Sequence, residues 1–337
     1  MEKKLISVVI LNWNGSKMLR RFLPSVVENS PEACVIVADN GSTDDSLSML
    51  RSEFPEVGIM AFDRNYGFAE GYNRAIAEVE TPYVLLLNDD VEVEPGWLKP
   101  MLDFMETHSD VAACQPKVLS EQQRDTFEYA GACGGFVDYL GYPFCRGRMF
   151  DVVEKDEGQY DEPIPVFWAT GAALFVRTQV YREVGGLDAR FFAHQEEIDL
   201  CWRLRSRGYG IWCIPQSVVY HVGGGTLSKS NPRKTFLNFR NNLLMLYKNL
   251  PHVQPTLFVR FVLDDVAALQ MLLTGHVADA RAVVRAHHEF RKIKSEFKDA
   301  KSLNRQLAVT DTIPEIWRKS LLVARYIRGI RRYCDWT

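Results

Sequence analysis

Residues 83–93 read YVLLLNDDVEV, an uninterrupted apolar run that stops at Asn88, Asp89 and Asp90. Short apolar runs bounded by polar turn residues are typical of strands buried on both faces of a sheet. Ligands of open α/β sheets collect at the carboxyl ends of such strands. The segment therefore predicts an α/β protein with a ligand site at residues 88–90.

Asp89 and Asp90 place two adjacent carboxylates at that strand end. Mutual repulsion and loss of hydration disfavour their charged forms, so a positive partner is expected. A divalent cation is the simplest partner, because hard cations prefer carboxylate oxygens and keep positions open for substrate phosphates. The pair therefore predicts a metal and a phosphorylated substrate.

The first half of the chain alternates between strand and helix patterns. Strands are expected at 5–11, 34–38, 57–62, 83–87 and 111–115, and helices at 16–28, from about 44, at 68–79 and at 97–108. This spacing indicates βαβ units, a mostly parallel sheet and right-handed crossovers.

The second half is less regular. Residues 120–165 are rich in Gly, Tyr, Phe and charge without a clear period, so we expect an irregular insertion over the active face. Regular structure is expected again at 166–176, 178–184, 196–207 and 217–221, and from 231 onward in about four helices.

Length and composition limit the domain organisation and the type of protein that the sequence can encode. A chain of 337 residues favours one large domain with an appendage. The net charge of −3 argues against a nucleic-acid binder, although residues 281–337 carry fourteen Lys/Arg against six Asp/Glu. The seven scattered cysteines include no CxxC pair, which indicates reduced thiols in a cytoplasmic protein.

Targeting and nucleotide motifs are not seen in the sequence. The start MEKKLISVVILNWNG enters a strand directly, so no secretory signal peptide is expected, and no run reaches the ~18 apolar residues of a spanning helix. The first loop, Asn12-Trp13-Asn14-Gly15, is not followed by GxGxxG, and there is no GxxxxGK[ST]. A nicotinamide enzyme and a P-loop enzyme are therefore disfavoured.

Seven segments in order carry a family resemblance: ILNWNG, VADNGSTDDS, RNYGFAEGYN, LLLNDDVEVEPGWL, WATGAALFVR, FFAHQEEIDLCWR and YHVGGGT. Together they resemble family 2 glycosyltransferases of the GT-A fold, and most of all the bacterial, rhamnosyltransferase-like branch that builds surface polysaccharides. The resemblance covers about residues 5–245. It implies a Rossmann-like, mostly parallel sheet flanked by helices in a catalytic domain at 1–245, with 120–165 as an acceptor-side insertion, and a helical C-terminal region at 246–337.

The resemblance also implies an activity. We expect inverting transfer from a nucleotide-diphosphate sugar, such as dTDP-rhamnose or a UDP-sugar, to a hydroxyl of a saccharide or lipid-linked saccharide. Mg²⁺ or Mn²⁺ is the implied cofactor, and no covalent intermediate is expected. A processive synthase is disfavoured, because spanning helices and a QxxRW-like motif are both missing from the sequence.

The donor site follows from the matched motifs. Asp39 is expected to bond the base or ribose, with a capping role for the next helix as the alternative. The first loop is expected to contact the base largely through backbone groups, and Gly67 is a position where close backbone approach excludes a side chain. The expected nucleotide-sugar contacts are Asn12, Trp13, Asp39, Arg64, Asn65, Gly67, Asn88, Asp89, Trp168 and Gly171.

Asp90, the last acid of NDDV, matches the metal ligand of the family. Asp89 then becomes a ribose contact or a turn residue. His221 closes a strand before the triple glycine 223–225 and is expected to complete the metal site, because neutral imidazole suits Mn²⁺ or Mg²⁺; a structural histidine is the alternative. Three basic residues beyond the glycines either contact the leaving diphosphate or form a solvated turn: Lys229, Arg233 and Lys234.

The catalytic base is expected in HQEEIDLCWR. The family commonly has Glu-Asp here, and the second acid deprotonates the acceptor hydroxyl; in this chain that position is Glu197. An inverting displacement needs such a base opposite the leaving group. Glu196 and Asp199 are the alternates, and three acids at a helix start would also complement the helix dipole.

The C-terminal region is basic, with aromatic and aliphatic residues interleaved at 281–301 and 317–332. Such helices can lie on an anionic membrane surface, so we expect peripheral contact with the inner face of the cell membrane, where a lipid-linked acceptor would be found. A helical cap with a solvated basic face, or a homodimer contact, is the alternative.

Two other functions share parts of this pattern. A sugar-phosphate nucleotidyltransferase would use the same sheet and metal, but it should show a Gly-rich basic loop after the first strand, which NWNG is not. A non-catalytic carbohydrate-binding relative would keep the fold and lose the acids. The presence of Asp39, Asp90 and Glu197 argues against that relative.

Overall fold

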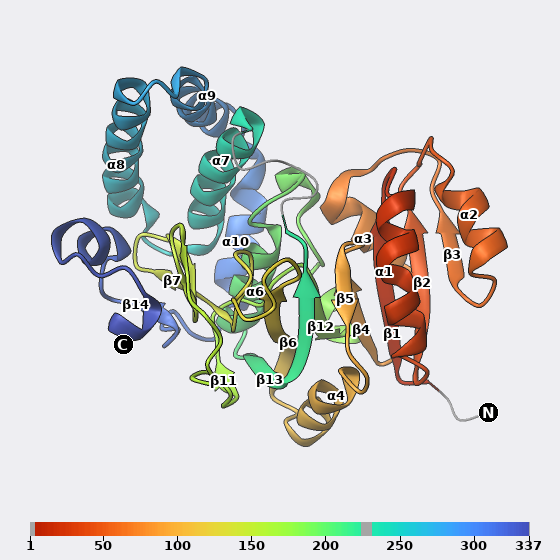
Figure 1. Ribbon diagram of the computed structural model, residues 1–337. Helices are drawn as coiled ribbons and strands as arrows, with labels where there is room; N and C mark the ends of the chain where they lie inside the picture. The colour runs from red at the N-terminus through yellow and green to blue at the C-terminus, as the bar shows by residue number, and fades with distance from the viewer. Residues whose placement is uncertain (1–3, 224–230, 337) are drawn as a thin grey trace.

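The computed structural model describes residues 4–223 and 231–336. Its centre is a nine-stranded sheet with the order β11-β13-β6-β12-β4-β1-β2-β3, in which β5 also pairs with β13 (Figure 1). The strands are β1 (Ile6–Asn12), β2 (Ala33–Asp39), β3 (Gly58–Ala61), β4 (Tyr83–Leu87), β5 (Val91–Val93), β6 (Val111–Ser120), β11 (Ile164–Pro165), β12 (Ala173–Arg177) and β13 (Gly210–His221).

The parallel part of the sheet aligns the ends of three strands. β1 pairs in parallel with β2 and β4, and β2 with β3, whereas β12 runs antiparallel to both β4 and β6. All five residues of β4 are buried, as its apolar sequence predicts. Because parallel strands end at the same edge, Asn12, Asp39 and Asn88 emerge together.

Helices cover both faces of this sheet. One core contains residues of α1 (Ser16–Glu28), α2 (Ser46–Glu53) and α4 (Leu98–Thr107). The other contains residues of α3 (Gly67–Ala77), α5 (Thr178–Glu183) and α6 (Glu196–Ser206). The predicted α/β layering is therefore confirmed, and most element bounds lie within two residues of the expected ones.

The segment 120–165 differs from the expectation of irregular structure. It contains β7 (Gly135–Asp138), β8 (Pro143–Cys145), β9 (Arg148–Met149) and β10 (Val152–Val153), which join β14 (Ile316–Trp317) in a second sheet of order β10-β9-β8-β7-β14. Aromatic rings from the chain end pack on it: the Phe144 and Trp317 centroids are 5.1 Å apart, and those of Phe136 and Tyr333 are 5.9 Å apart. Packing against a distant segment orders these short strands, so no local pattern predicted them.

Four α-helices form most of the C-terminal region, as predicted: α7 (Pro232–Asn249), α8 (Val253–Leu273), α9 (Val277–Ile293) and α10 (Lys298–Leu307). Asn231 caps α7 by accepting from the amide of Arg233 at 2.9 Å. The basic stretch 317–332 is not one helix, because β14 and a π-helical turn at Val323–Ile327 occupy it. Short 3₁₀ turns lie at Ala189–Phe191, Lys294–Phe297 and Tyr333–Asp335.

Two other strands differ from the expected ones only in their length. The strand expected at 166–176 is regular only in β12, and β13 is much longer than the expected 217–221. All seven cysteines are free thiols, as predicted. None of the helices in the described part of the chain is both long and apolar enough to cross a membrane.

Candidate active site

Asp90 and His221 meet beyond the end of β4. The antiparallel pairing of β5 with β13 sets Val91 opposite His221, and the amide of Val222 donates to the Asp90 carbonyl. His221 Nε2 lies 3.0 Å from Asp90 Oδ1, and both side chains are buried. Asn88 Nδ2 lies 3.3 Å from the same ring nitrogen. Backbone pairing therefore brings a carboxylate and an imidazole to one point.

Glu128 lies on the other side of His221 and was not identified from the sequence. Its Oε2 is 3.4 Å from His221 Nδ1, and its side chain is buried. Burial lowers the pKa of His221, but its interactions with Asp90 and Glu128 outweigh burial and raise that pKa to about 10. A carboxylate behind an imidazole is a common way to orient a metal-ligating ring. An acid inside the aromatic run TFEYAG was the available signal.

The donor chemistry of this corner fits part of a divalent-cation site. Carboxylate oxygen and imidazole nitrogen are both accepted by Mn²⁺ and Mg²⁺. Among the described residues, no group of three or more His, Cys, Asp or Glu side chains is arranged to hold a metal. Asp90 and His221 would therefore supply two ligands once a cation displaces the ring proton that the raised pKa retains, and phosphate oxygens or water would supply the remainder.

Asp89 lies between this corner and the first loop. A Cβ atom on Gly15 would come within 2.4 Å of Asp89 Oδ2, so only glycine leaves room for the carboxyl there. Burial first, and then the charge of Asp90, raise the pKa of Asp89 to about 7.

Asn12 and Asp39, at the ends of β1 and β2, bond to each other. Asn12 Nδ2 donates to Asp39 Oδ1 at 2.8 Å and to Ser42 Oγ at 3.1 Å, and the amide of Ser42 donates to Asp39 Oδ2 at 3.0 Å. Both side chains are fully buried, whereas Trp13 is 52% exposed. The bonds made by Asp39 hold two loops together, so a nucleotide contact would have to use its remaining lone pairs.

The loop after β3 meets the segment that precedes α6. Asn65 Oδ1 accepts from Asn40 Nδ2 at 3.1 Å and from the Gly67 amide at 2.7 Å. Gly67 has a φ of 79°, and a Cβ there would approach the ring of Phe192 to 3.2 Å. Arg64 and Asn65 are exposed beside this contact.

The acids of α6 follow a strained segment. Phe192, His194 and Gln195 have φ values of 68°, 69° and 73°, the left-handed region that non-glycine residues rarely occupy. Glu196 and Glu197 each have an Oε2 atom that is buried without a hydrogen-bond partner among the described residues. Burial raises the pKa of Glu197 to about 7, and burial together with Glu197 raises the pKa of Glu196 well above its usual value. A carboxyl that titrates near neutral pH suits a general base.

Gly171 links these acids to Asn88. A Cβ on Gly171 would lie 3.7 Å from Glu197 Cβ and 3.5 Å from Phe68 Cζ, so the open side of this glycine faces Glu197, and only an added side-chain atom would reach van der Waals contact with it. The next residue, Ala172, accepts from the amide of Asn88 through its carbonyl at 3.0 Å. The turn before β12 therefore joins Glu197 to the turn that carries Asp90.

Asp199 has a different environment from Glu197. It is fully buried, and its Oδ2 accepts from Lys248 Nζ at 2.7 Å and from Arg203 Nε at 3.0 Å. Its Oδ1 accepts from Asn249 Nδ2 at 2.8 Å. These contacts join α6 to α7, so we do not retain Asp199 as an alternate base.

Trp168 and Arg233, also considered from the sequence, contact other segments around this site. Trp168 packs over Gly135 and donates from Nε1 to the Phe136 carbonyl at 3.0 Å, so it contacts the insertion rather than Glu197. Arg233 stacks on Phe192, with its guanidinium carbon 5.1 Å from the ring centroid. Lys229 lies outside the described residues.

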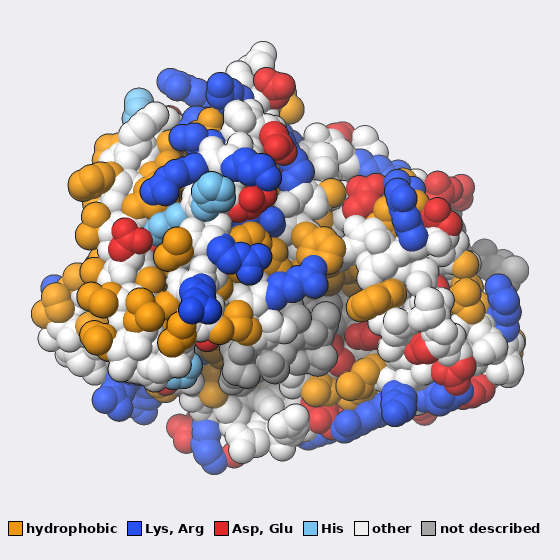
Figure 2. All heavy atoms as spheres, turned by 90° about the horizontal axis from the view of Figure 1, so that it is seen from above, with side chains coloured by type: hydrophobic (Ala, Val, Ile, Leu, Met, Phe, Trp, Pro, Cys, Tyr) orange, Lys and Arg blue, Asp and Glu red, His pale blue; other side chains and the backbone are white. Residues whose placement is uncertain are grey.

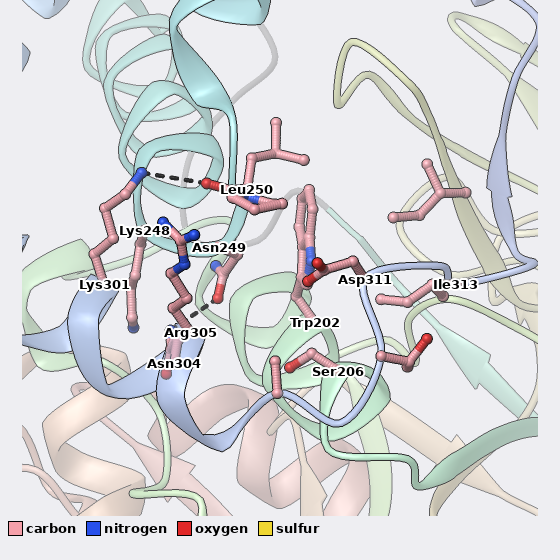
Figure 3. A pocket seen from close by; sticks show the side chains of 14 residues that line it. Trp202, Ser206, Lys248, Asn249, Leu250, Lys301, Asn304, Arg305, Asp311 and Ile313 are labelled. Atoms are coloured by element: carbon pink, nitrogen blue, oxygen red, sulfur yellow. Dashed lines mark hydrogen bonds between the residues drawn. The ribbon is translucent and has the colours of Figure 1, made fainter.

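A small hollow behind α6 does not belong to this site. It lies among Trp202, Asn249 and Asn304, and Lys301 closes one side by donating to the Leu250 carbonyl at 3.2 Å (Figure 3). Its volume is about 40 Å³, room for a few water molecules but not for a sugar.

Comparison with known proteins indicates the family to which this architecture corresponds. The family model described as Glycosyl transferase family 2 matches residues 7–162. Residues 7–162 therefore form a family 2 glycosyltransferase domain. The predicted rhamnosyltransferase-like family and enzyme class are thereby confirmed, since relatives of this transferase carry those names.

Two such relatives each cover 64% of this chain. N-acetylglucosaminyl-diphospho-decaprenol L-rhamnosyltransferase of Mycobacterium tuberculosis is 28% identical over an alignment of 236 residues, and the match covers 64% of this chain and 76% of that protein. Rhamnosyltransferase WbbL of Escherichia coli K12 is 22% identical over 227 residues, or 64% and 83% of the two chains.

Solved structures confirm the GT-A fold of the transferase. The structure of GalNAc-T7 with UDP, GalNAc and Mn²⁺ matches with a TM-score of 0.58 at 17% identity, over 75% of this chain and half of that chain. Mannosyltransferase PcManGT from Pyrobaculum calidifontis, in complex with GDP-Man and Mn²⁺, matches with a TM-score of 0.52 at 12% identity, over 91% and 86% of the two chains.

Proposed function

We propose that the transferase moves a sugar from a nucleotide-diphosphate donor to a hydroxyl of a saccharide or lipid-linked saccharide during surface polysaccharide synthesis. The supporting observation is the connection of Glu197, through Gly171 and Ala172, to the turn that carries Asp90. dTDP-rhamnose or a UDP-sugar is the proposed donor, because rhamnosyltransferases are among the relatives.

The nucleotide would lie on the loops after β1, β2 and β3, and its diphosphate beside Asp90 and His221. These two residues would hold Mn²⁺ or Mg²⁺, which when bound neutralises charge on the departing diphosphate. Glu128, beside Nδ1, would keep the ring of His221 oriented from the side away from the metal.

Glu197 would take the proton of the acceptor hydroxyl. The acceptor oxygen forms its bond to the anomeric carbon as the bond from that carbon to the diphosphate oxygen breaks, so the configuration inverts. The released products are the nucleoside diphosphate and the glycosylated acceptor. Among the described residues, Glu197 Oε2 is buried without a hydrogen-bond partner, so an acceptor hydroxyl would be a suitable donor to it when the carboxyl is ionised.

Membrane contact is the second part of this proposal. Exposed apolar side chains follow one face of α8, with Phe258 72%, Val266 59% and Leu273 80% exposed. Figure 2 shows hydrophobic side chains gathered on the left, the side on which α8 lies in Figure 1. The stripe consists of Phe258, Val262, Val266, Leu269 and Leu273, and a peripheral position on the inner face of the cell membrane would cover it.

Release of nucleoside diphosphate from a panel of nucleotide sugars, with and without Mn²⁺, tests the transferase proposal. We expect a single donor class to be consumed, with activity lost on chelation and in Asp90→Ala and Glu197→Gln. Activity that survives both substitutions would refute the assigned roles. Vesicle flotation of Phe258→Glu/Val266→Glu tests membrane contact, and a stripe buried in a dimer would appear instead as a halved mass in that variant.

A further inference from the structure

Four arginines line a groove between α7 and α9. The groove has a volume of about 680 Å³, and Phe192 and Phe236 form part of its wall. Figure 2 views the molecule from the side at which α7 and α9 lie in Figure 1, and it shows several Lys and Arg side chains on that face. We call this feature the arginine groove, and its cations are Arg233, Arg240, Arg281 and Arg285.

The acids of the described residues balance the positive charge of the arginine groove only in part. Among the ion pairs of the described residues, none includes any of the four cations. Arg281 and Arg285 are four residues apart on α9, a spacing at which like charges repel. Burial lowers the pKa of Arg240, and attraction from Glu289 offsets that effect only in part. An anion bound in the groove would offset both effects.

Aromatic rings and hydrogen bonds hold these guanidinium groups in place. The guanidinium carbons of Arg240 and Arg285 lie 5.4 Å and 5.3 Å from the centroid of Phe236, and Arg233 stacks on Phe192. Arg240 also donates to the side-chain oxygen of its neighbour Asn241 and to a backbone carbonyl of the segment before α6. Oriented guanidinium groups of this kind match the paired oxygens of phosphates.

The groove adjoins the catalytic segment but not the metal corner. Phe192 belongs to its wall and lies three residues before Gln195, where the turn into α6 begins. Asn241 Nδ2 donates to the carbonyls of Phe191, Ala193 and His194 at 3.0, 2.8 and 2.8 Å, so α7 supports the segment that leads to Glu197. Neither Asp90 nor His221 lines the groove.

We propose that the arginine groove binds the diphosphate of a lipid-linked acceptor. This inference rests on the proposed function, because it concerns the acceptor of that reaction. Four guanidinium groups exceed the charge of one phosphate, and the groove has room for two phosphates. α8 packs on α9 and carries the exposed apolar stripe, so a lipid chain leaving the groove has an apolar surface beside it. The sugar at the other end would follow residues 192–197 to Glu197.

Binding of farnesyl diphosphate and inorganic pyrophosphate, measured by isothermal titration calorimetry, tests the site without any need for turnover. The variant is Arg281→Gln/Arg285→Gln. The matched control is Arg291→Gln/Lys292→Gln, which removes two charges from the same helix outside the groove. We expect the groove variant to bind both probes at least tenfold more weakly, and the control to bind them as the wild type does.

Three outcomes would overturn the proposal. The first is that the wild type binds neither probe. The second is that the groove variant loses affinity for UDP and dTDP as much as for the two probes, which would mean that the arginines bind the donor nucleotide. The third is that only phosphatidylglycerol vesicles bind in a manner sensitive to Arg281 and Arg285, which would make the groove a lipid-headgroup surface.

A kinetic comparison separates this proposal from the proposed function. If the enzyme transfers sugar, the groove variant should raise KM at least tenfold for a diphosphate-linked acceptor and leave KM for the same sugar on a neutral aglycone within twofold. Equal effects on both acceptors would refute the groove as a diphosphate site. If no donor supports transfer, the proposed function fails while the calorimetric test still decides the groove.

Discussion

Glu197→Gln should make the transferase more stable while it abolishes activity. The pKa of Glu197 is raised from 4.5 in the unfolded chain to about 7 in the fold, chiefly because the carboxyl is buried. A raised carboxyl pKa means that the fold disfavours the charged form. Its contribution to stability is therefore fully present below pH 4.5 and is lost as the pH rises through 7.

The size of the effect follows from the pKa difference. At pH 8 the ionised Glu197 costs about 3 kcal/mol, because each pKa unit corresponds to about 1.4 kcal/mol. At pH 5 the cost falls below about 1 kcal/mol, since the carboxyl is then mostly protonated in the fold. For a chain of this length, about 0.7 kcal/mol shifts Tm by one degree, so glutamine should raise Tm by about 4 °C at pH 8 and about 1 °C at pH 5.

Thermal unfolding at both pH values, followed by circular dichroism, measures this difference. Asp103→Asn is the control, because Asp103 pairs with Lys99 at the surface, its side chain is 59% exposed and its Tm difference should not grow with pH. A Tm difference for Glu197→Gln that is negative, or equal at the two pH values, would refute the claim that burial holds this carboxyl near neutral pH.

Four further outcomes follow from the site. With Glu197 as the base, kcat/KM should rise about tenfold between pH 6 and pH 8, and a flat profile at saturating metal would exclude a base with a pKa near 7. His221→Ala should weaken Mn²⁺ binding in the presence of nucleotide about tenfold or more, measured by electron paramagnetic resonance, and unchanged affinity would remove His221 from the metal site. Gly171→Ala should be tolerated, because its Cβ would make ordinary contacts, whereas Gly171→Val should lower kcat/KM about tenfold or more at unchanged Tm; equal activities would mean that this glycine does not border the substrate. Asp199→Ala should cost about 3 kcal/mol in chemical denaturation, because Arg203 and Lys248 lose a buried partner, and a loss of activity at full stability would instead restore Asp199 as a catalytic candidate.

The sequence predicted the parallel half of the sheet well, because each of its elements has a local signal. β1, β2 and β4 are short apolar runs that end in polar residues, and the helices between them show clear amphipathic spacing. The motif at residues 88–90 predicted a site at a strand end, because open sheets bind ligands there.

What the sequence missed depends on distant contacts. β5 has only three residues and is a strand because β13 pairs with it. Glu128 has meaning only beside His221, and that approach is set by the long parallel pairing of β6 with β13. Asp199 was grouped with Glu196 and Glu197 by spacing alone, and only the packing of α7 revealed its partners, Lys248 and Asn249.

The hydrogen bond from the Asn88 amide to the Ala172 carbonyl has a consequence for how such an enzyme can diversify. Since this bond joins two main-chain groups, replacement of neighbouring side chains leaves intact the spacing between the base and the turn that carries Asp90. The 120–165 insertion, with its own small sheet, lies outside that bond. With this insertion as the proposed acceptor side, exchange of surface residues there would change acceptor preference and leave the main-chain bond between Asn88 and Ala172 in place.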